Sequence, residues 1–261
     1  MTNASPITRV AAHSLIWNVP RGRSFEPWLD EVVAAGYDGI AIFGFQIEDF
    51  LDDPAELERR LEDRSLRLAA VTAFMNDTPE WSKQIMQFMS RLGTTHLAFS
   101  DFDTTLTIPL AAQILNERGA VAKQHGVRVY YHNHTGGVGE TMTEVEQIVD
   151  PDLVGVMLDV GHATKDFSEL PAVDRAATFL DRHWSRIEHL ELKDWNEETD
   201  LNTPLGEGYA DFDRIFGLME SNGYRGDWLT VEQNGHEGLS RGRSPLECAT
   251  QSRELVRRYG I

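Results

Sequence analysis

The chain has little cysteine: Cys248 is the only one among its 261 residues. A single thiol excludes an intrachain disulfide and any zinc or iron–sulfur site built from several cysteines. Long hydrophobic runs are also missing, and none reaches the roughly 18 residues that a membrane-spanning helix needs. The first residues, Met-Thr-Asn-Ala-Ser-Pro, carry neither a charged leader nor an apolar stretch. We therefore expect no signal peptide and a reduced, cytoplasmic setting.

Basic residues are scarce as well. The chain has 24 Lys and Arg against 42 Asp and Glu, which gives a net charge of −18. Nucleic-acid-binding proteins gain much of their affinity from a basic surface, so this charge argues against a DNA or RNA partner. It also disfavours anionic membrane surfaces. We expect no nucleic acid and no membrane as partners, but a small molecule, and the sequence leaves open whether identical chains form an oligomer.

Strand-like apolar runs alternate with helical patterns along the whole chain. Strands are predicted at residues 9–17, 39–43, 67–74, 95–99, 127–131, 154–158, 187–192 and 228–231. Helices are predicted at residues 25–35, 55–63, 80–92, 109–124, 143–149, 169–182, 211–222 and 245–259. Alternation of this kind indicates a parallel sheet covered by helices, and eight units favour a closed barrel over an open sheet. We predict an α/β fold, a (β/α)8 TIM barrel with residues 1–261 as a single domain.

Motifs for nucleotide cofactors are absent too. No Gly-rich dinucleotide fingerprint follows the first strand, and no phosphate-binding Gly-Lys-Ser/Thr loop occurs anywhere. The Gly-rich stretch at residues 136–139 follows a strand end and two histidines. It is equally well interpreted as a flexible active-site loop or as a structural turn.

Four predicted strands in the C-terminal half end in residue types that bind metals or move protons. The residues are His132, His134, Asp159, His162, His189, Glu191 and Glu232. Because the carboxyl ends of barrel strands meet on one face, we expect these side chains to share a common volume. Carboxylates gathered there would repel one another, and a divalent cation such as Mg or Mn relieves that repulsion. A site of two carboxylates and a histidine would suit Fe, Co or Zn as well.

Each of these residues also has a purely structural interpretation. Asp159 or Glu232 could be a solvated strand-end carboxylate, although their position favours a ligand. His132 and His134 alternate and so share one face of a strand, which favours a site over two structural histidines. His13 is equally well interpreted as part of the pocket wall or as a residue that only packs in the core. Aromatic residues near strand ends could form an apolar wall, although core packing is their more common fate; they are Trp17, Phe43, Phe74 and Trp195.

At these residues the chain resembles the sugar-isomerase-like barrel superfamily. That group includes xylose isomerase-like proteins, inosose dehydratase, hydroxypyruvate isomerase, keto-sugar 3-epimerases and endonuclease IV. The resemblance spans nearly the whole chain and is strongest to the inosose dehydratase-like branch of sugar phosphate isomerase/epimerase proteins. It is carried by the segment 34–40 (Ala-Ala-Gly-Tyr-Asp-Gly-Ile), by His132-Asn133-His134, Asp159-Val160-Gly161-His162 and Leu192-Lys193-Asp194, and by residues 204–208 (Pro-Leu-Gly-Glu-Gly).

The resemblance implies a set of metal ligands. In the family these are a glutamate after strand 5, an aspartate after strand 6, a histidine on strand 7 and a glutamate ending strand 8. The matching positions here are Glu140, Asp159, Glu191 and Glu232. Substrate contacts are implied for His162, Lys193 and Glu207, and we add His132 and Trp17 to the predicted substrate-binding residues.

One of these positions departs from the family. The family reads His-x-His-x-Lys-Asp on strand 7, whereas this chain has Glu191 where the second, metal-binding histidine stands. His189 occupies the first histidine position. Either Glu191 binds the metal in an all-carboxylate site, or the metal is weak, different or absent.

These residues lead to one main functional hypothesis and three alternatives. The main one is a divalent-metal-dependent isomerase, epimerase or dehydratase that acts on a keto-sugar or keto-cyclitol. Glu140, Glu232 or His134 would remove the proton next to the carbonyl. The alternatives are a non-catalytic or partner-dependent sugar-binding barrel, a lyase subunit acting on 3-keto-glycosides, and an endonuclease IV-like phosphodiesterase, which the acidic charge disfavours.

Overall fold

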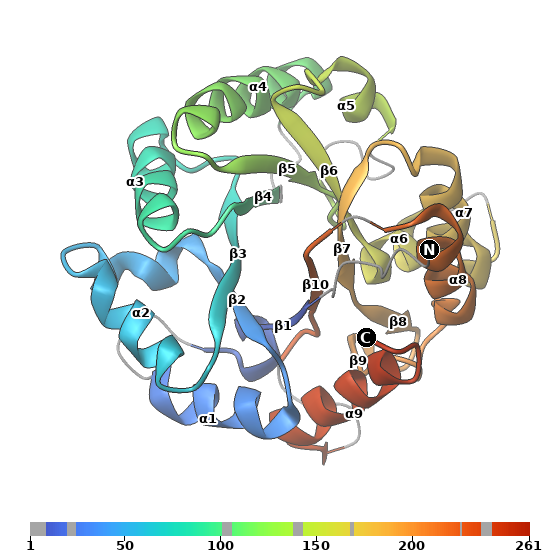
Figure 1. The fold of residues 1–261 in the computed structure, drawn as a ribbon. Coiled ribbons are helices and arrows are strands. Elements are labelled where there is room, and N and C mark those ends of the chain that lie inside the picture. The colour runs from blue at the N-terminus through green and yellow to red at the C-terminus, as the bar shows by residue number, and fades with distance from the viewer. Residues whose placement is uncertain are drawn as a thin grey trace, which may run out of the picture.

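The computed structural model describes residues 9–19, 25–100, 106–137, 143–167, 170–224, 226–235 and 242–261. Within these ranges, eight parallel strands close into a barrel with helices around its outside (Figure 1). The order around the barrel is β1-β10-β7-β6-β5-β4-β3-β2. This arrangement confirms the predicted (β/α)8 TIM barrel.

The elements lie close to their predicted ranges. The barrel strands are β1 (Arg9–His13), β2 (Gly39–Phe43), β3 (Arg67–Phe74), β4 (His96–Ser100), β5 (Arg128–His132), β6 (Val154–Asp159), β7 (Ile187–Leu192) and β10 (Trp228–Val231). The helices are α1 (Phe25–Ala35), α2 (Pro54–Glu62), α3 (Pro79–Arg91), α4 (Ile108–Gln124), α5 (Thr143–Ile148), α6 (Val160–Asp166), α7 (Ala172–His183), α8 (Phe212–Asn222) and α9 (Pro245–Arg257).

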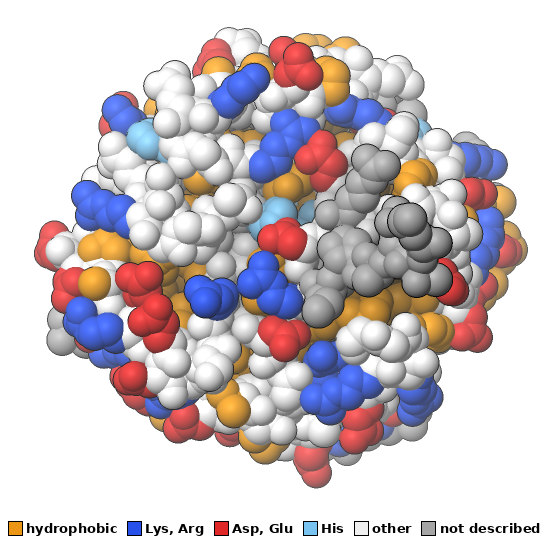
Figure 2. Space-filling model, in the orientation of Figure 1, with side chains coloured by type: hydrophobic (Ala, Val, Ile, Leu, Met, Phe, Trp, Pro, Cys, Tyr) orange, Lys and Arg blue, Asp and Glu red, His pale blue; other side chains and the backbone are white. Residues whose placement is uncertain are grey.

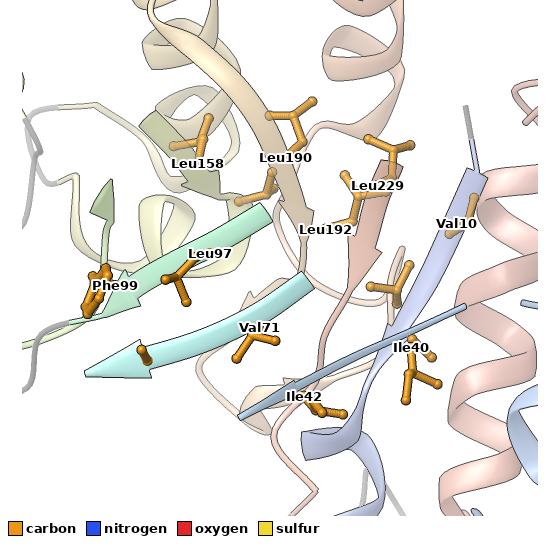
Figure 3. Packing of buried hydrophobic residues seen from close by; sticks show 14 of the residues in the cluster. Val10, Ile40, Ile42, Val71, Leu97, Phe99, Leu158, Leu190, Leu192 and Leu229 are labelled. Atoms are coloured by element: carbon orange, nitrogen blue, oxygen red, sulfur yellow. The ribbon is translucent and has the colours of Figure 1, made fainter. Parts of the chain in front are cut away.

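Alternate residues of each strand point to opposite sides of the barrel wall. On β2, Ile40 and Ile42 belong to the large core between the strands and the surrounding helices (Figure 3). Gly39, on the same strand, instead approaches the Trp228 ring inside the barrel. A strand buried on both sides must be apolar on both sides, and this explains the near-continuous apolar runs in the sequence.

The part of the barrel interior nearer the amino ends of the strands is filled by side chains and is not a channel. One buried cluster comprises Ala11, Ala69 and Trp228, and another comprises Ala98, Tyr130 and Met157. Beyond these layers, several charged side chains from different strands lie close together near the carboxyl ends of the strands.

The structure differs from the prediction in three places. The predicted strand 9–17 ends at His13 and continues as a 3-10 helix over Ser14–Trp17. The predicted helix 169–182 corresponds to α7, and the short helix α6 that precedes it was not predicted. A two-stranded antiparallel sheet, β8 (Asp194–Asn196) with β9 (Asp200–Thr203), follows β7 and was not predicted. Its short polar strands lack the apolar alternation from which strands are recognised.

Asp194 anchors the loop that follows this small sheet. Its buried carboxylate accepts hydrogen bonds from the backbone amides of Gly206, Gly208 and Ala210 at 2.9, 2.9 and 3.1 Å. Gly208 has no room for a side chain, because a Cβ there would lie 2.1 Å from Asp194 Oδ1. The segment 204–208 singled out in the sequence is thus held against the end of β7.

The described helices include none that is both long and apolar enough to cross a bilayer. On the face drawn in Figure 2, acidic and basic side chains lie beside one another. Ion pairs among the described residues include Arg128–Glu188 and Arg9–Asp227.

Gly39 provides a test of this packing. A Cβ at Gly39 would lie 2.5 Å from the carbonyl oxygen of Arg67 and 2.7 Å from the Trp228 ring. We predict that Gly39→Ala lowers the free energy of unfolding by about 2 kcal/mol or more, because neither neighbour is free to move.

The matched control is Gly217→Ala on the exposed side of α8, where a Cβ meets nothing within 4 Å. We expect that change to be neutral or to stabilise by up to about 1 kcal/mol. Urea unfolding of both variants is the measurement. Equal stability of the two would contradict the packing described for β2.

Candidate active site

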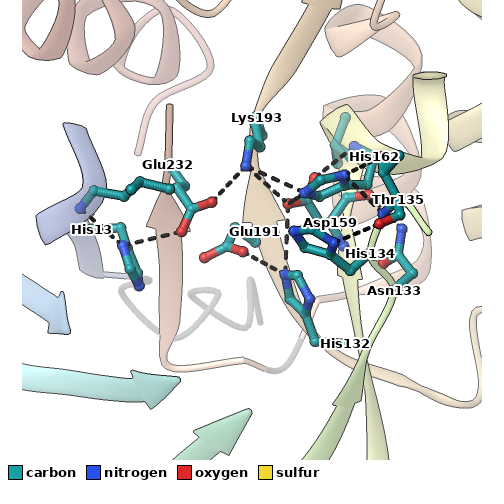
Figure 4. Close-up of polar contacts among 12 residues, drawn as sticks. His13, His132, Asn133, His134, Thr135, Asp159, His162, Glu191, Lys193 and Glu232 are labelled. Atoms are coloured by element: carbon teal, nitrogen blue, oxygen red, sulfur yellow. Dashed lines mark hydrogen bonds and ion pairs between the residues drawn. The ribbon is translucent and has the colours of Figure 1, made fainter. Parts of the chain in front are cut away.

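Polar side chains from five strands meet at the carboxyl end of the barrel (Figure 4). They are His13 at the end of β1, His132 at the end of β5, Asp159 at the end of β6, Glu191 on β7, Lys193 directly after β7, and Glu232 directly after β10. All six are buried, with at most 6% of their surface exposed. Figure 4 shows Glu232 and His13 on one side of the cluster, His132, Asp159, His134 and His162 on the other, and Lys193 and Glu191 between them.

One half of the cluster is built around Glu191. Its Oε2 lies 2.8 Å from His132 Nε2, and Asp159 Oδ2 lies 3.6 Å from the same nitrogen. Burial by itself would lower the pKa of His132, but the neighbouring carboxylates of Asp159 and Glu191 outweigh it and raise that pKa to about 10. Burial and the charge of Glu232 raise the pKa of Glu191 to about 7.

The other half is built around Glu232. Lys193 Nζ lies 2.6 Å from Glu232 Oε1, and it also lies 3.8 Å from Asp159 Oδ2. The nearby ammonium outweighs the opposing effect of burial and holds the pKa of Glu232 below its usual range. Glu232 is therefore an ionised carboxylate.

His13 faces the second oxygen of Glu232. Its Nδ1 lies 3.0 Å from Glu232 Oε2, yet the same nitrogen accepts a hydrogen bond from the backbone amide of Leu15. Burial lowers the pKa of His13 to about 4, so its imidazole is neutral near pH 7. A nitrogen whose lone pair accepts this bond cannot also donate to the carboxylate, so the two atoms are in contact without a hydrogen bond between them.

A second group of contacts surrounds His162 and His134. Thr135 Oγ1 lies 2.8 Å from His162 Nδ1 and donates to Asp166 Oδ2 at 2.5 Å. The rings of His134 and His162 are 4.1 Å apart. Burial, together with the charges of His132 and Lys193, lowers the pKa of His134 to about 4. The imidazole of His134 is therefore unprotonated and able to accept a proton.

Asn133 fixes the position of Asp159. Its side-chain oxygen accepts from the Asp159 amide at 2.8 Å, and its side-chain nitrogen donates to the Asp159 carbonyl at 3.1 Å. Asp159 Oδ1 in turn accepts from the backbone amide of His162 at 2.9 Å and so caps helix α6. The other oxygen, Oδ2, is left to point into the cluster.

The barrel mouth is less polar on the side of β2 and β3. The Phe43 ring contacts His13 edge-on at 4.7 Å and stacks on Phe45 and Phe74 at 5.2 and 5.8 Å. Between this wall and His132 lies Ser100 at the end of β4, with a buried hydroxyl that has no hydrogen-bond partner in the described part of the chain. The mouth therefore combines a charged half with an aromatic half.

Several residues singled out in the sequence lie elsewhere. His189 is buried deeper in the barrel, where it bonds Thr230 Oγ1 at 3.0 Å and its ring approaches that of His96. Trp17 packs on Trp28 and donates to Glu31 at 2.6 Å. Glu207 pairs with Arg243 at 2.7 Å and accepts from Gln251. Glu140 falls outside the described residues, so the structure gives it no position.

Sequence reasoning did not identify Asn133, Thr135 or Ser100, and it left His13 undecided. Amide and hydroxyl side chains at strand ends are common, so these residues carried no distinguishing signal. Asn133 and Thr135 are recognised only by their contacts with Asp159 and His162, which belong to other elements.

Two hollows of about 370 and 470 Å³ lie at the opposite end of the barrel. Both are lined by residues that precede or begin strands, including His96 and Asp227. Barrel enzymes build their sites at the carboxyl ends of the strands, so the buried cluster is the better candidate.

Comparison with known proteins agrees with this geometry. The family model described as "Xylose isomerase-like TIM barrel" matches residues 29–259. An inosose dehydratase of Clostridium perfringens is 25% identical, over 90% of this chain and 89% of its own.

Solved structures share the fold. The structure of an L-ribulose 3-epimerase covers 97% of this chain and 94% of its own with a TM-score of 0.76 at 18% identity. A D-allulose 3-epimerase from Methylomonas sp. covers 97% of this chain and 98% of its own with a TM-score of 0.75 at 15% identity. The family match spans nearly all of the chain, from α1 to the end of α9. The chain therefore belongs to the xylose isomerase-like TIM barrel family, among enzymes of the isomerase, epimerase and lyase group.

Proposed function

We propose that the protein is a divalent-metal-dependent isomerase, epimerase or dehydratase that acts on a keto-sugar or keto-cyclitol. The observation that carries this proposal is the buried cluster in which Asp159, Glu191 and Glu232 converge at the barrel mouth. Three carboxylates taken out of water are costly unless positive charge accompanies them. The names of the similar proteins, a dehydratase and sugar epimerases, support the same class of reaction.

The described residues fit a hard or borderline cation. Ligand atoms of His132, Asp159 and Glu191 lie within 4.8 Å of one another, as do those of His13, Glu191 and Glu232. Asp159 Oδ2 and Glu191 Oε1 are buried and have no hydrogen-bond partner among the described residues. Carboxylate oxygens with one or two imidazole nitrogens suit Mn²⁺, Mg²⁺ and similar ions.

The position of His132 bears on whether the site can bind a metal although Glu191 stands where the family has a histidine. The resemblance implies one imidazole and three carboxylates, with the imidazole on strand 7. The described strand ends hold the same types of ligand, but the imidazole comes from β5 and the carboxylate from β7, and the two side chains contact each other at 2.8 Å. We infer that His132 and Glu191 have exchanged places across the site, so that Glu191 does not imply the loss of metal binding.

The chemistry then divides between the cation and the side chains. A divalent ion bound here supplies a Lewis acid that polarises a carbonyl and an adjacent hydroxyl of the substrate. Glu232 and His134 are both unprotonated, and Figure 4 shows them on opposite sides of Lys193. One of these acceptors would remove the α-proton. For epimerisation, the other would first take up a proton from solvent and then deliver it to the opposite face, whereas in isomerisation the first group could return the proton itself. If a β-hydroxyl leaves instead, Lys193 is positioned to donate a proton to it.

The proposed reaction is tested by α-proton exchange. Purified protein with Mn²⁺ or Mg²⁺ is incubated in D2O with ketohexoses and with keto-cyclitols such as inososes. Nuclear magnetic resonance then follows deuterium at the carbon next to the carbonyl, and absorbance follows any new double bond. A protein that binds these sugars without exchange or elimination would be a sugar-binding barrel, and the proposal would be wrong.

Asp159→Asn and Glu232→Gln test the residues that carry the proposal. We predict that each variant loses at least about a hundredfold in exchange rate, because general-base and Lewis-acid contributions are of that size or larger. Bound metal, measured by mass spectrometry after dialysis, is expected to fall together with activity. Asp174→Asn, a change on the outer helix α7, is the control and should alter neither quantity. Full activity of either site variant after removal of metal would contradict the proposal.

The exchange of His132 and Glu191 is tested by swapping them. We predict that Glu191→His alone weakens Mn²⁺ binding by about tenfold or more, because it places two imidazoles against each other and removes a negative charge. The double variant His132→Glu/Glu191→His restores the set of ligands and is expected to recover most of that affinity. Calorimetric titration measures both. If the double variant binds Mn²⁺ no more tightly than Glu191→His alone, the two positions are not equivalent ligands.

A further inference from the structure

Lys193 has an unusual environment for a lysine. It follows β7 directly, its side chain is 1% exposed, and its ammonium lies within 4 Å of two carboxylates. A buried ammonium is costly unless it is paired, and here Glu232 at 2.6 Å supplies the pairing. The stem of the side chain is closely packed, because a Cβ on Gly161 would lie 2.7 Å from Lys193 Cγ.

Lys193 is a fixed positive charge beside a group of three buried carboxylates, Asp159, Glu191 and Glu232. One divalent ion together with the ammonium would match the three negative charges that these carboxylates carry when all are ionised.

The same geometry makes the ammonium and a metal ion competitors. Glu232 Oε1 is held by Lys193 at 2.6 Å, so an ion that takes this oxygen as a ligand must move the ammonium away. The packed stem leaves the terminal ammonium as the part that moves. Its other neighbours are His162 Nε2 at 3.4 Å and Asp159 Oδ2 at 3.8 Å, both on the far side of the cluster from Glu232.

We propose that Lys193 is a built-in counter-ion that stabilises the carboxylate cluster before a metal arrives and is displaced from Glu232 when the metal binds. This proposal rests on the metal dependence proposed above. It makes Lys193 a positioning residue that links metal binding to substrate binding. Once the metal has displaced the ammonium from Glu232, the ammonium becomes available to a substrate oxygen beside His162. Substrate is therefore expected to bind more tightly to the metal-loaded protein than to the metal-free one.

The test compares Lys193→Met with the wild-type chain in two states. In the presence of EDTA, the variant is expected to melt lower by on the order of 10 °C, since three buried carboxylates lose their fixed counter-charge. In calorimetric titration at one pH, the variant is expected to bind Mn²⁺ about tenfold more tightly or better, because a competing positive charge is gone. A merely structural lysine would give the first result without the second.

Two further variants keep the comparison interpretable. Lys83→Met removes the same charge from the exposed side of α3 and should change neither quantity. If Lys193→Met does not fold in EDTA, the double variant Lys193→Met/Glu232→Gln removes one member of each sign. It is expected to melt above Lys193→Met in EDTA, and an equal or lower melting temperature would overturn the pairing.

The outcomes separate this inference from the proposed function. If the wild-type chain binds Mn²⁺ and exchanges the α-proton, but Lys193→Met binds Mn²⁺ no more tightly, the counter-ion role is wrong and the proposed function stands. If the wild-type chain exchanges the proton without any metal and neither protein binds Mn²⁺, the metal dependence and this inference are both wrong.

Discussion

The pairing of the first barrel strand with the last holds the site together. Residues 9–12 of β1 lie in parallel register with residues 228–231 of β10, and this contact closes the sheet into a cylinder. Closure places His13 beside Glu232, although the two residues lie near opposite ends of the chain. An open sheet of the same strands would leave β1 at an edge, and its carboxyl end would not face the ends of β5, β6 and β7.

The electrostatics of the cluster follow from this closure. Carboxylates that would be solvated at the end of an isolated strand are forced together in a space from which water is largely excluded. Lys193 and His132 compensate for the carboxylates' negative charge, and Asp159 accepts a hydrogen bond from the backbone amide of His162. Two carboxylate oxygens of the cluster have no hydrogen-bond partner in the described part of the chain, and a buried acceptor in this state costs about 1–3 kcal/mol. The proposed cation, if bound here, would remove this cost.

The exchange proposed for His132 and Glu191 would keep the same types of metal ligand while the strand that supplies each one changes. Along the chain, Glu191 stands where the family has a histidine, and this suggests a lost ligand. Across the barrel, its carboxylate contacts an imidazole supplied by β5. A cation responds to the types of donor around it and not to the strand that supplies each one. This chain and its family are therefore better compared by the whole set of possible metal-ligand atoms than position by position.

The alternation of eight apolar runs with helices was enough to predict a closed barrel, because strands buried on both faces need continuous apolar sequence and eight units favour closure over an open sheet. Strand-end position likewise predicted that Asp159, Glu191 and Glu232 lie together, whereas Lys193 was predicted from the family resemblance. The sequence could not identify the β8–β9 sheet, whose strands are held by polar contacts, or assign the neutral state of His13 and His134. Those depend on burial and on charges from other strands, and they exist only once the barrel has closed. Composition and periodicity thus determined the fold and the residue types at the strand ends, whereas tertiary structure decided which side chains meet and which carry charge.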